Sequence, residues 1–292
     1  MPSTRDIRRR IKSVKSTAQI TRAMQMVASS KMRKAQLAAL AGRPYATLMN
    51  DVLAAVSEGA GDFTHPLLEK RDGVKRAVIL ISTDKGLCGA LNSNLFREAA
   101  KFEKDTTIYI CAGKKAGQFV SRMKRQLAAE FSYKDNPHFA EARAISKFAQ
   151  DMFLKGEVAQ VDVLYTNFIN TLSQKPEVRQ LLPIGKIEAL EVGVDGQGQG
   201  SELKKSDVEY LFEPNAGDVL GNLLPHYVNF QVFQFLLEAK ASEHSSRMVA
   251  MKNATDNAKQ LIKDLTLEYN KLRQANITKE LLEITTAQMA MG

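Results

Sequence analysis

Tryptophan is absent from this chain of 292 residues, and cysteine occurs only at Cys88 and Cys111. Two cysteines provide neither a disulfide framework nor a cluster of metal ligands. No stretch approaches the roughly 18 consecutive apolar residues that a transmembrane helix needs. The basic first residues are followed by no apolar segment, so we expect no secretory signal. The sequence therefore predicts a protein without disulfides, metal sites or membrane-spanning segments.

Helix-breaking residues are missing from both ends of the chain. No proline follows Pro225, and no glycine lies between Gly221 and Gly292. A run of this length could span roughly 100 Å as one helix. Residues 3–41 also lack both breakers, and their apolar side chains recur at helical spacing, at Ile7, Ile11, Val14, Ile20, Met24 and Val27. Since a lone helix would leave such a stripe in water, two long terminal helices predict a coiled coil that carries an inserted domain.

Strand and helix patterns alternate in the middle of the chain. Short strands are predicted at 77–81, 106–111, 160–167 and 178–183, and helices at 87–104, 114–125 and 139–154. This alternation is typical of an α/β domain with a largely parallel sheet. The glycine-rich stretch 193–200 predicts a loop, and 208–212 a short strand or an extended lead into the last helix. The predicted fold is a Rossmann-like α/β domain at 74–206, between coiled-coil helices at 1–60 and 207–292.

The sequence contains no recognisable catalytic constellation. Its four histidines are scattered, and no nucleophile motif or paired carboxylates appear. The turn after the first strand contains Gly86 and Gly89, and 112–117 reads AGKKAG, but neither matches a phosphate-binding motif. We therefore expect no cofactor and no small-molecule substrate. A stand-alone nucleotide-binding enzyme built on residues 74–206 stays open as an alternative, which nucleotide titration would decide.

Positive charge is concentrated at the start of the chain. The first 36 residues hold ten Lys and Arg but only one acidic residue, Asp6, so they account for the whole net charge of +9. Three interpretations stay open: a solvated helix face, a helix in an acidic protein cavity, or one lying along nucleic-acid phosphates. Because residues 1–44 contain no aromatic side chain, they offer no platform for base stacking.

The C-terminal end is unusually neutral. No charged residue follows Glu283, although helix ends normally favour Lys or Arg. The end of this helix either frays or is buried in an apolar socket on a partner.

Four long segments carry a resemblance to a known family. They are DIRRRIKSVKSTAQITRAMQMVASSKMRKAQ at 6–36, STDKGLCGALN at 82–92, ASEHSSRMVAMKNATDNA at 241–258 and NKLRQANITKELLEI at 270–284. Together they resemble the gamma subunit of the F-type ATP synthase over essentially the whole chain. The departures from the family pattern are Gln25, Thr83 and Ala287-Gln288.

The resemblance implies a central rotor shaft without a catalytic site of its own. In that family the two terminal helices pair antiparallel inside a ring of three alpha and three beta subunits. The α/β domain forms a foot that rests, with epsilon, on the c-ring. Proton flow turns the ring and the shaft, and the shaft biases the beta subunits among states of different nucleotide affinity. The implied location is the cytoplasmic face of the bacterial plasma membrane, with no nucleic-acid partner.

The resemblance also implies roles for particular residues. Matching positions imply contacts with beta subunits for Met24, Arg273, Gln274, Thr278 and Glu280, and an apolar bearing at Ile277, Leu281 and Ile284. Tyr210 and Glu213 are the implied contacts of the foot with the c-ring and epsilon. Seam packing of Met24 and simple solvation of Arg273 remain the alternatives.

Overall fold

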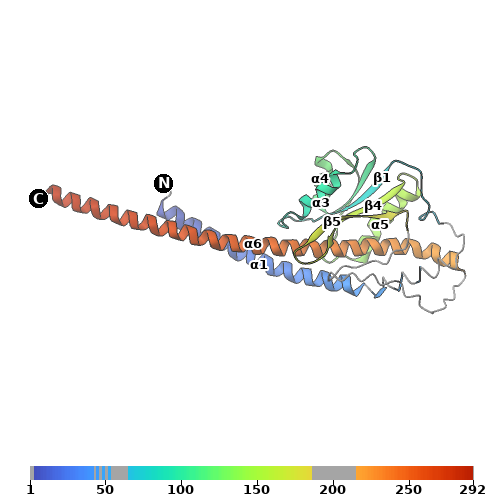
Figure 1. The fold of residues 1–292 in the computed structure, drawn as a ribbon, viewed down its shortest axis with the longest axis horizontal. Helices are drawn as coiled ribbons and strands as arrows, with labels where there is room; N and C mark the ends of the chain where they lie inside the picture. Colours follow the sequence, from blue (N-terminus) through green and yellow to red (C-terminus); the bar gives the residue numbers. More distant parts are fainter. Residues whose placement is uncertain are drawn as a thin grey trace. The chain divides into compact units, whose positions relative to one another are not determined.

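The computed structural model describes residues 3–42, 44–45, 48–49, 52–53, 65–185 and 215–291. The chain divides into two compact units, one made of Met1–Val27 with Met248–Gly292 and the other of Ala28–Arg247. Two long helices, α1 (Thr4–Ala41) and α6 (Ala216–Met291), contribute to both units (Figure 1). Beyond α1, the described residues at 44–45, 48–49 and 52–53 are helical.

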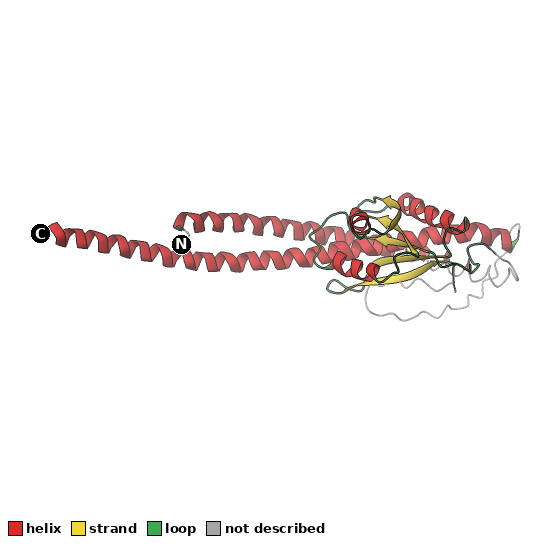
Figure 2. Cartoon of the chain, turned by 90° about the horizontal axis from the view of Figure 1, so that it is seen from above, coloured by secondary structure: helices red, strands yellow, loops and turns green. Residues whose placement is uncertain are grey.

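The first unit is an antiparallel pair of helices. In both views α1 and α6 run side by side in opposite directions (Figures 1 and 2). The least exposed positions are 4, 7, 11, 14, 18, 21 and 25 on α1, and 251, 255, 258, 262, 265, 269 and 272 on α6. These spacings alternate between three and four residues, which is the repeat of a coiled coil. The Thr21 and Thr255 hydroxyls are hydrogen-bonded at 2.7 Å and fix the register. The predicted antiparallel coiled coil is confirmed.

The apolar stripe predicted on α1 is wrong at Ile20 and Val27. Ile20 is 57% exposed and Val27 is 54% exposed, whereas Thr21 is buried in the seam. The physical reason is the repeat. The seam continues from Val14 in steps of four and three to Ala18 and Thr21, whereas the step of six from Val14 to Ile20 turns roughly 120° away from that face. The seam therefore selects small residues here, and the larger side chains of Ile20 and Val27 face outward.

The second unit is built on a five-stranded sheet. Its strands are β1 (Arg76–Ile81), β2 (Thr107–Ala112), β3 (Gln126–Phe131), β4 (Gln160–Phe168) and β5 (Gln174–Leu182), in the order β3-β2-β1-β4-β5. The first four strands are parallel, and β5 pairs antiparallel with β4. The predicted α/β domain with a largely parallel sheet is confirmed. The sequence analysis missed β3, because this edge strand is mostly exposed and has no apolar run.

Helices cover both faces of the sheet (Figure 1). They are α3 (Leu91–Ala100), α4 (Lys114–Arg122) and α5 (Phe139–Leu154), together with the part of α6 in this unit. Side chains alternate along β1, so Val78 and Leu80 pack against α3 and α4, while Ile79 and Ile81 face α5 and α6. The helices predicted at 87–104 and 114–125 are shorter than expected, and the one at 139–154 agrees with α5.

The start of α6 belongs to the core of the second unit. The Asn215 side chain accepts a hydrogen bond from the Asp218 amide at 2.8 Å, which caps the helix. The helix continues through Pro225, and its apolar residues, including Leu224, Val232 and Leu236, are buried against the sheet. The compact unit therefore takes in part of α6 in addition to the predicted range 74–206. The expectations for 193–200 and 208–212 lie outside the described residues.

Candidate functional site

The end of α6 is exposed on all sides. Leu272 is the last half-buried seam position, and every residue described from Arg273 to Met289 is exposed. In both views this end of α6 extends beyond the start of α1 (Figures 1 and 2). The large apolar side chains left in solvent are Ile277, Leu281, Leu282, Ile284 and Met289. An apolar helix surface of this kind indicates a binding site for another protein.

The threonine side chains of this segment donate their hydroxyl hydrogens within the helix. The hydroxyls of Thr278, Thr285 and Thr286 donate to the backbone carbonyl four residues earlier, at 2.9, 2.9 and 2.8 Å. Their methyl groups are therefore the parts left to meet a partner. The ion pair of Lys279 with Glu283, at 3.7 Å, is the last charged feature of the helix. The final turns thus present a surface that is apolar and poor in directional contacts.

The structure collects most of the predicted site residues on this one segment. Arg273, Ile277, Leu281 and Ile284 are spaced by four, four and three residues, so they share a face of α6. Gln274, Thr278 and Glu280 flank that face. Met24 lies on α1 and is half-buried. Because the register pairs Thr21 with Thr255, Met24 is roughly 30 Å along the axis from Arg273, and the structure does not bring it to the exposed end. Tyr210 and Glu213 lie outside the described residues.

The basic part of α1 is open to solvent. The exposed cations on the part of α1 in the first unit are Arg5, Arg8, Arg9, Arg10, Lys12, Lys15 and Arg22. Asp6 is bound locally, because its amide donates to the Ser3 hydroxyl oxygen at 3.2 Å and its carboxylate accepts from that hydroxyl at 2.8 Å. This hydrogen bonding with Ser3 lowers the pKa of Asp6. The cationic face therefore has no acidic partner on α1 beyond the helix cap.

The cysteines and titratable groups show no catalytic arrangement. Among the residues that the structure describes, no cluster of three His, Cys, Asp or Glu could hold a metal ion. Both cysteines are buried, and burial raises the pKa of Cys88 and raises that of Cys111 to about 12. Neither thiol is a reactive thiolate at neutral pH.

The start of α4 does not have the free amides that a phosphate site requires. The Lys114 amide donates to Asp84 Oδ1 at 2.9 Å, and the Ala116 amide donates to Ser82 Oγ at 2.7 Å. Gly113 has a φ of 99°, and a Cβ there would lie 2.3 Å from the Ser82 carbonyl oxygen. This glycine therefore allows the backbone before α4 to lie close to the backbone of Ser82. The amides that bind phosphate at other helix N-termini are already satisfied here, which argues against the nucleotide-binding alternative.

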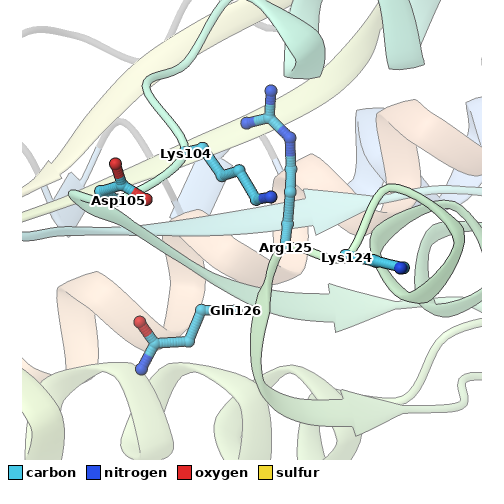
Figure 3. A pocket seen from close by; sticks show the side chains of 5 residues that line it. All are labelled: Lys104, Asp105, Lys124, Arg125 and Gln126. Atoms are coloured by element: carbon cyan, nitrogen blue, oxygen red, sulfur yellow. The ribbon is translucent and has the colours of Figure 1, made fainter.

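A pocket of about 350 Å³ lies near the amino ends of β2 and β3, lined by Lys104, Asp105, Lys124, Arg125 and Gln126 (Figure 3). Its arginine is already used by the fold. The Arg125 guanidinium donates to the carbonyls of Phe102 and Ala100 at 2.8 and 2.9 Å, and to the Tyr109 hydroxyl at 3.0 Å. It thereby binds backbone carbonyls at and just after the C-terminal end of α3. The pocket offers no converging set of free donors for a ligand.

Sequence reasoning missed one set of contacts in this chain. Ala241 packs with Ala35 of α1. The serines beside Ala241 donate to backbone carbonyls of the α/β domain, as Ser242 does to the Thr166 carbonyl of β4 at 2.9 Å. The sequence shows only that serines stand at 242, 245 and 246, which does not reveal the groups that they bind.

In the described part of the chain, no helix is both long and apolar enough to cross a membrane.

The profile of the family described as ATP synthase matches residues 3–291. Two curated relatives named ATP synthase gamma chain are similar over nearly all of both chains. The one from Methylacidiphilum infernorum is 48% identical with 100% of each chain covered, and the one from Opitutus terrae is 49% identical with 99% of each covered. This chain belongs to the ATP synthase gamma-chain family.

Solved structures agree with the gamma-chain fold. The central stalk and c-ring structure of the Tetrahymena thermophila mitochondrial ATP synthase contains a chain that is 25% identical, with a TM-score of 0.60 over 80% of this chain and 99% of that one. A chain of the Euglena gracilis mitochondrial enzyme, at 21% identity, has the same fold with a TM-score of 0.67 over 99% and 94%. As a gamma chain, this protein is the central shaft of an ATP synthase, a non-catalytic subunit and a peripheral part of that membrane complex.

Proposed function

We propose that this chain couples proton-driven rotation of a c-ring to ATP synthesis and hydrolysis at three beta subunits. The observation that supports the proposal most strongly is the exposed apolar end of α6, from Arg273 to Met289. A helix end of this length would not stay uncovered in water if it had no partner, because its apolar side chains favour burial. A ring of alpha and beta subunits around it would provide that cover.

The chemistry of the end suits a bearing. Apolar contact is non-directional, so its energy changes little as one surface turns against another. Hydrogen bonds and ion pairs are directional and would create preferred angles. The stripe of Ile277, Leu281 and Ile284 is apolar, and the nearby threonine hydroxyls donate within the helix. We propose these three residues as the part that turns within an apolar sleeve.

A second set of residues would transmit a signal to the beta subunits, and it overlaps the apolar stripe and extends further from the tip. We propose Arg273, Gln274, Thr278 and Glu280, together with Met24 on α1, as this set. Arginine can form a bidentate pair with a carboxylate, which gives an angle-dependent contact at Arg273. The shaft shifts a beta subunit between states only by as much as its contacts differ between them.

The other end of the chain would meet the membrane sector. We propose that the α/β domain rests on the c-ring and epsilon, with Tyr210 and Glu213 among the contacts, at the cytoplasmic face of a bacterial plasma membrane. Support for a bacterial setting comes from the similar gamma chains of Methylacidiphilum infernorum and Opitutus terrae.

Reconstitution tests this proposal. The chain is mixed with cognate alpha and beta subunits, and complex formation and MgATP hydrolysis are measured. We expect a stable complex with ATPase activity that the chain alone lacks, and we expect truncation after Leu272 to impair it. Leu281→Glu places a charge on the apolar stripe and should lower activity, whereas Asn276→Glu adds the same charge to another exposed face and should not. A chain that neither joins alpha and beta nor alters their activity would refute the proposal.

A further inference from the structure

Three serines of α6 bind backbone carbonyls around the carboxyl ends of the parallel strands. Ser242 Oγ donates to the Thr166 carbonyl near the end of β4 at 2.9 Å. Ser245 Oγ donates to the Thr171 carbonyl in the loop after β4 at 2.8 Å. Ser246 Oγ donates to the Cys88 carbonyl in the turn after β1 at 2.7 Å. Within the second unit, α6 is thus held by directional bonds to two separate loops.

Charged residues of the same helical segment extend these contacts. The Arg247 guanidinium donates to the carbonyls of Lys85 and Gly86, both at 3.3 Å, and it is paired with Glu243 at 2.8 Å. Glu243 also accepts from the buried Lys240 ammonium at 3.0 Å. That ammonium lies 3.8 Å from Asp135, in the loop that follows β3. Three of the loops at the carboxyl edge therefore converge on residues 240–247 of α6.

This edge is the place where related sheets bind ligands. In the order β3-β2-β1-β4-β5 the direction of strand addition reverses between β1 and β4. Open α/β sheets hold nucleotides in the crevice at such a reversal, outside the carboxyl ends of the strands. In this chain the end of β4 and the loops after β1 and β4 instead present their carbonyls to Ser242, Ser245 and Ser246 of α6. The position that would take a nucleotide is filled by a helix of the same chain.

We propose that Ser242, Ser245 and Ser246 are positioning residues that fix the rotational setting of α6 in the α/β domain. Torque applied to that domain would then pass into the helix without slip. The inference rests on the proposed function, because it assigns these serines a place in the path of torque through the shaft.

The geometry supports resistance to rotation in particular. At about 100° per residue, Ser242, Ser245 and Ser246 span roughly 100° around α6, and Arg247 extends the arc of donors to roughly 200°. Apolar packing of the helix on the sheet is non-directional and tolerates small rotations. Hydrogen bonds weaken steeply when they are misaligned, so donors held on opposite flanks oppose turning in either direction.

The test measures torsional stiffness in the assembled rotary complex. A bead is attached to Ser121→Cys, an exposed site on α4, and its angular fluctuation is recorded while the beta subunits are stalled with nucleotide. The triple variant Ser242→Ala/Ser245→Ala/Ser246→Ala should increase the mean-square fluctuation by about twofold or more, since three directional bonds are lost. Unloaded ATP hydrolysis should stay close to that of wild type, while ATP-driven proton pumping falls.

Control variants separate positioning from general stability. Ser93→Ala, exposed on α3, should change nothing. Leu224→Ala, in the apolar contact with the sheet, should lower the melting temperature and leave the fluctuation unchanged. If the triple variant fails to assemble, the comparison of Ser246→Ala with Ser246→Thr decides, because threonine keeps the hydroxyl and should keep the stiffness.

The outcomes distinguish the two claims. If the wild-type complex rotates but the triple variant or Ser246→Ala shows the same angular fluctuation as wild type, this inference is overturned. The proposed function is then unaffected. A wild-type chain that forms no rotating complex overturns the proposed function, and the inference with it.

Discussion

At the scale of single residues, two buried titratable groups on α6 have pKa values that are strongly shifted in opposite directions. Burial raises the pKa of Glu238 to about 7, and a hydrogen bond with Tyr165 offsets part of that rise. Burial lowers the pKa of His244 to about 4, against an opposing influence from Glu243. Each group therefore favours its neutral form in the folded chain, so each links folding to pH.

Glu238→Gln should stabilise the chain in mildly alkaline solution. The unfolded carboxyl ionises near 4.5 and the folded one near 7. Wild-type stability is therefore lost as pH rises through this window, and glutamine removes the loss. We expect the variant to be more stable by about 2–3 kcal/mol at about pH 8 and similar to wild type near pH 4. Urea unfolding checks this, with the exposed Glu157→Gln as control. Equal stability of Glu238→Gln and wild type at alkaline pH would contradict it.

His244→Gln should protect the chain in mild acid. The imidazole faces Glu243 and Arg247 on its own helix, with Lys240 one turn earlier and Asp135 in the loop after β3. Since the folded pKa is about 4 and the unfolded value is 6.5, wild-type stability falls as pH drops between them. Glutamine cannot take up this proton. The loss of unfolding free energy from about pH 7 to about pH 4 should be smaller by about 2–3 kcal/mol in the variant. If the unfolding free energies of wild type and His244→Gln fall in parallel as pH drops, His244 does not contribute to the loss of stability in acid.

At the scale of elements, the coiled coil depends on which face of each helix is buried. Leu265 is 5% exposed in the seam, and two residues later Leu267 is 59% exposed. The register set by Thr21 and Thr255 places Leu265 opposite Ile11. Seam and surface leucines therefore differ in burial although they are close in sequence and identical in chemistry.

This pair provides a matched test of the seam. Leu265→Ala should cost about 2–4 kcal/mol, because it removes buried methyl groups and leaves a cavity. Leu267→Ala should change stability by no more than about 0.5 kcal/mol, as surface substitutions usually do. Both are measured by thermal unfolding of the same preparation. Similar losses for the two variants would mean that the helices do not pair in this register.

The elements show where sequence reasoning succeeds. The strand around Ile79 and helix α5 were predicted because an apolar run and a clear helical repeat are local signals. Strand β3 was missed because its place at the sheet edge, which comes from tertiary pairing with β2, leaves it exposed and without an apolar run. The outward orientation of Ile20 was missed because the prediction followed apolar residues, whereas the face that begins at Val14 continues through the polar Thr21.

At the scale of the whole molecule, the candidate site could be located from sequence but its partners could not be placed. The missing charge after Glu283 left two interpretations, a frayed end or one buried on a partner, and in the structure this segment is helical and exposed. The carbonyl contacts of Ser242, Ser245 and Ser246 were not predictable, because they join residues more than 70 positions apart. Such contacts depend on the folded topology, which no local pattern encodes.

Salt should weaken assembly through the cationic face of α1. Exposed charges are screened within roughly 8 Å at physiological ionic strength and over shorter distances in stronger salt. Raising NaCl from about 50 mM to about 500 mM should therefore lower the affinity of the chain for alpha and beta subunits. The variant Arg8→Gln/Arg9→Gln/Arg10→Gln should bind more weakly in low salt and respond less to added salt. An affinity that is independent of salt would rule out acidic surfaces as the partners of this face.

The central claim is that the chain turns inside its partners while ATP is hydrolysed. The most direct measurement is single-molecule rotation of the complex with alpha and beta subunits held fixed and a bead on Ser121→Cys. Because Cys88 and Cys111 are buried, the label should react with the introduced thiol and not with the two native ones. The account predicts unidirectional rotation that requires MgATP and is impaired by truncation after Leu272. Continuing ATP hydrolysis by the intact complex with a stationary bead would contradict it.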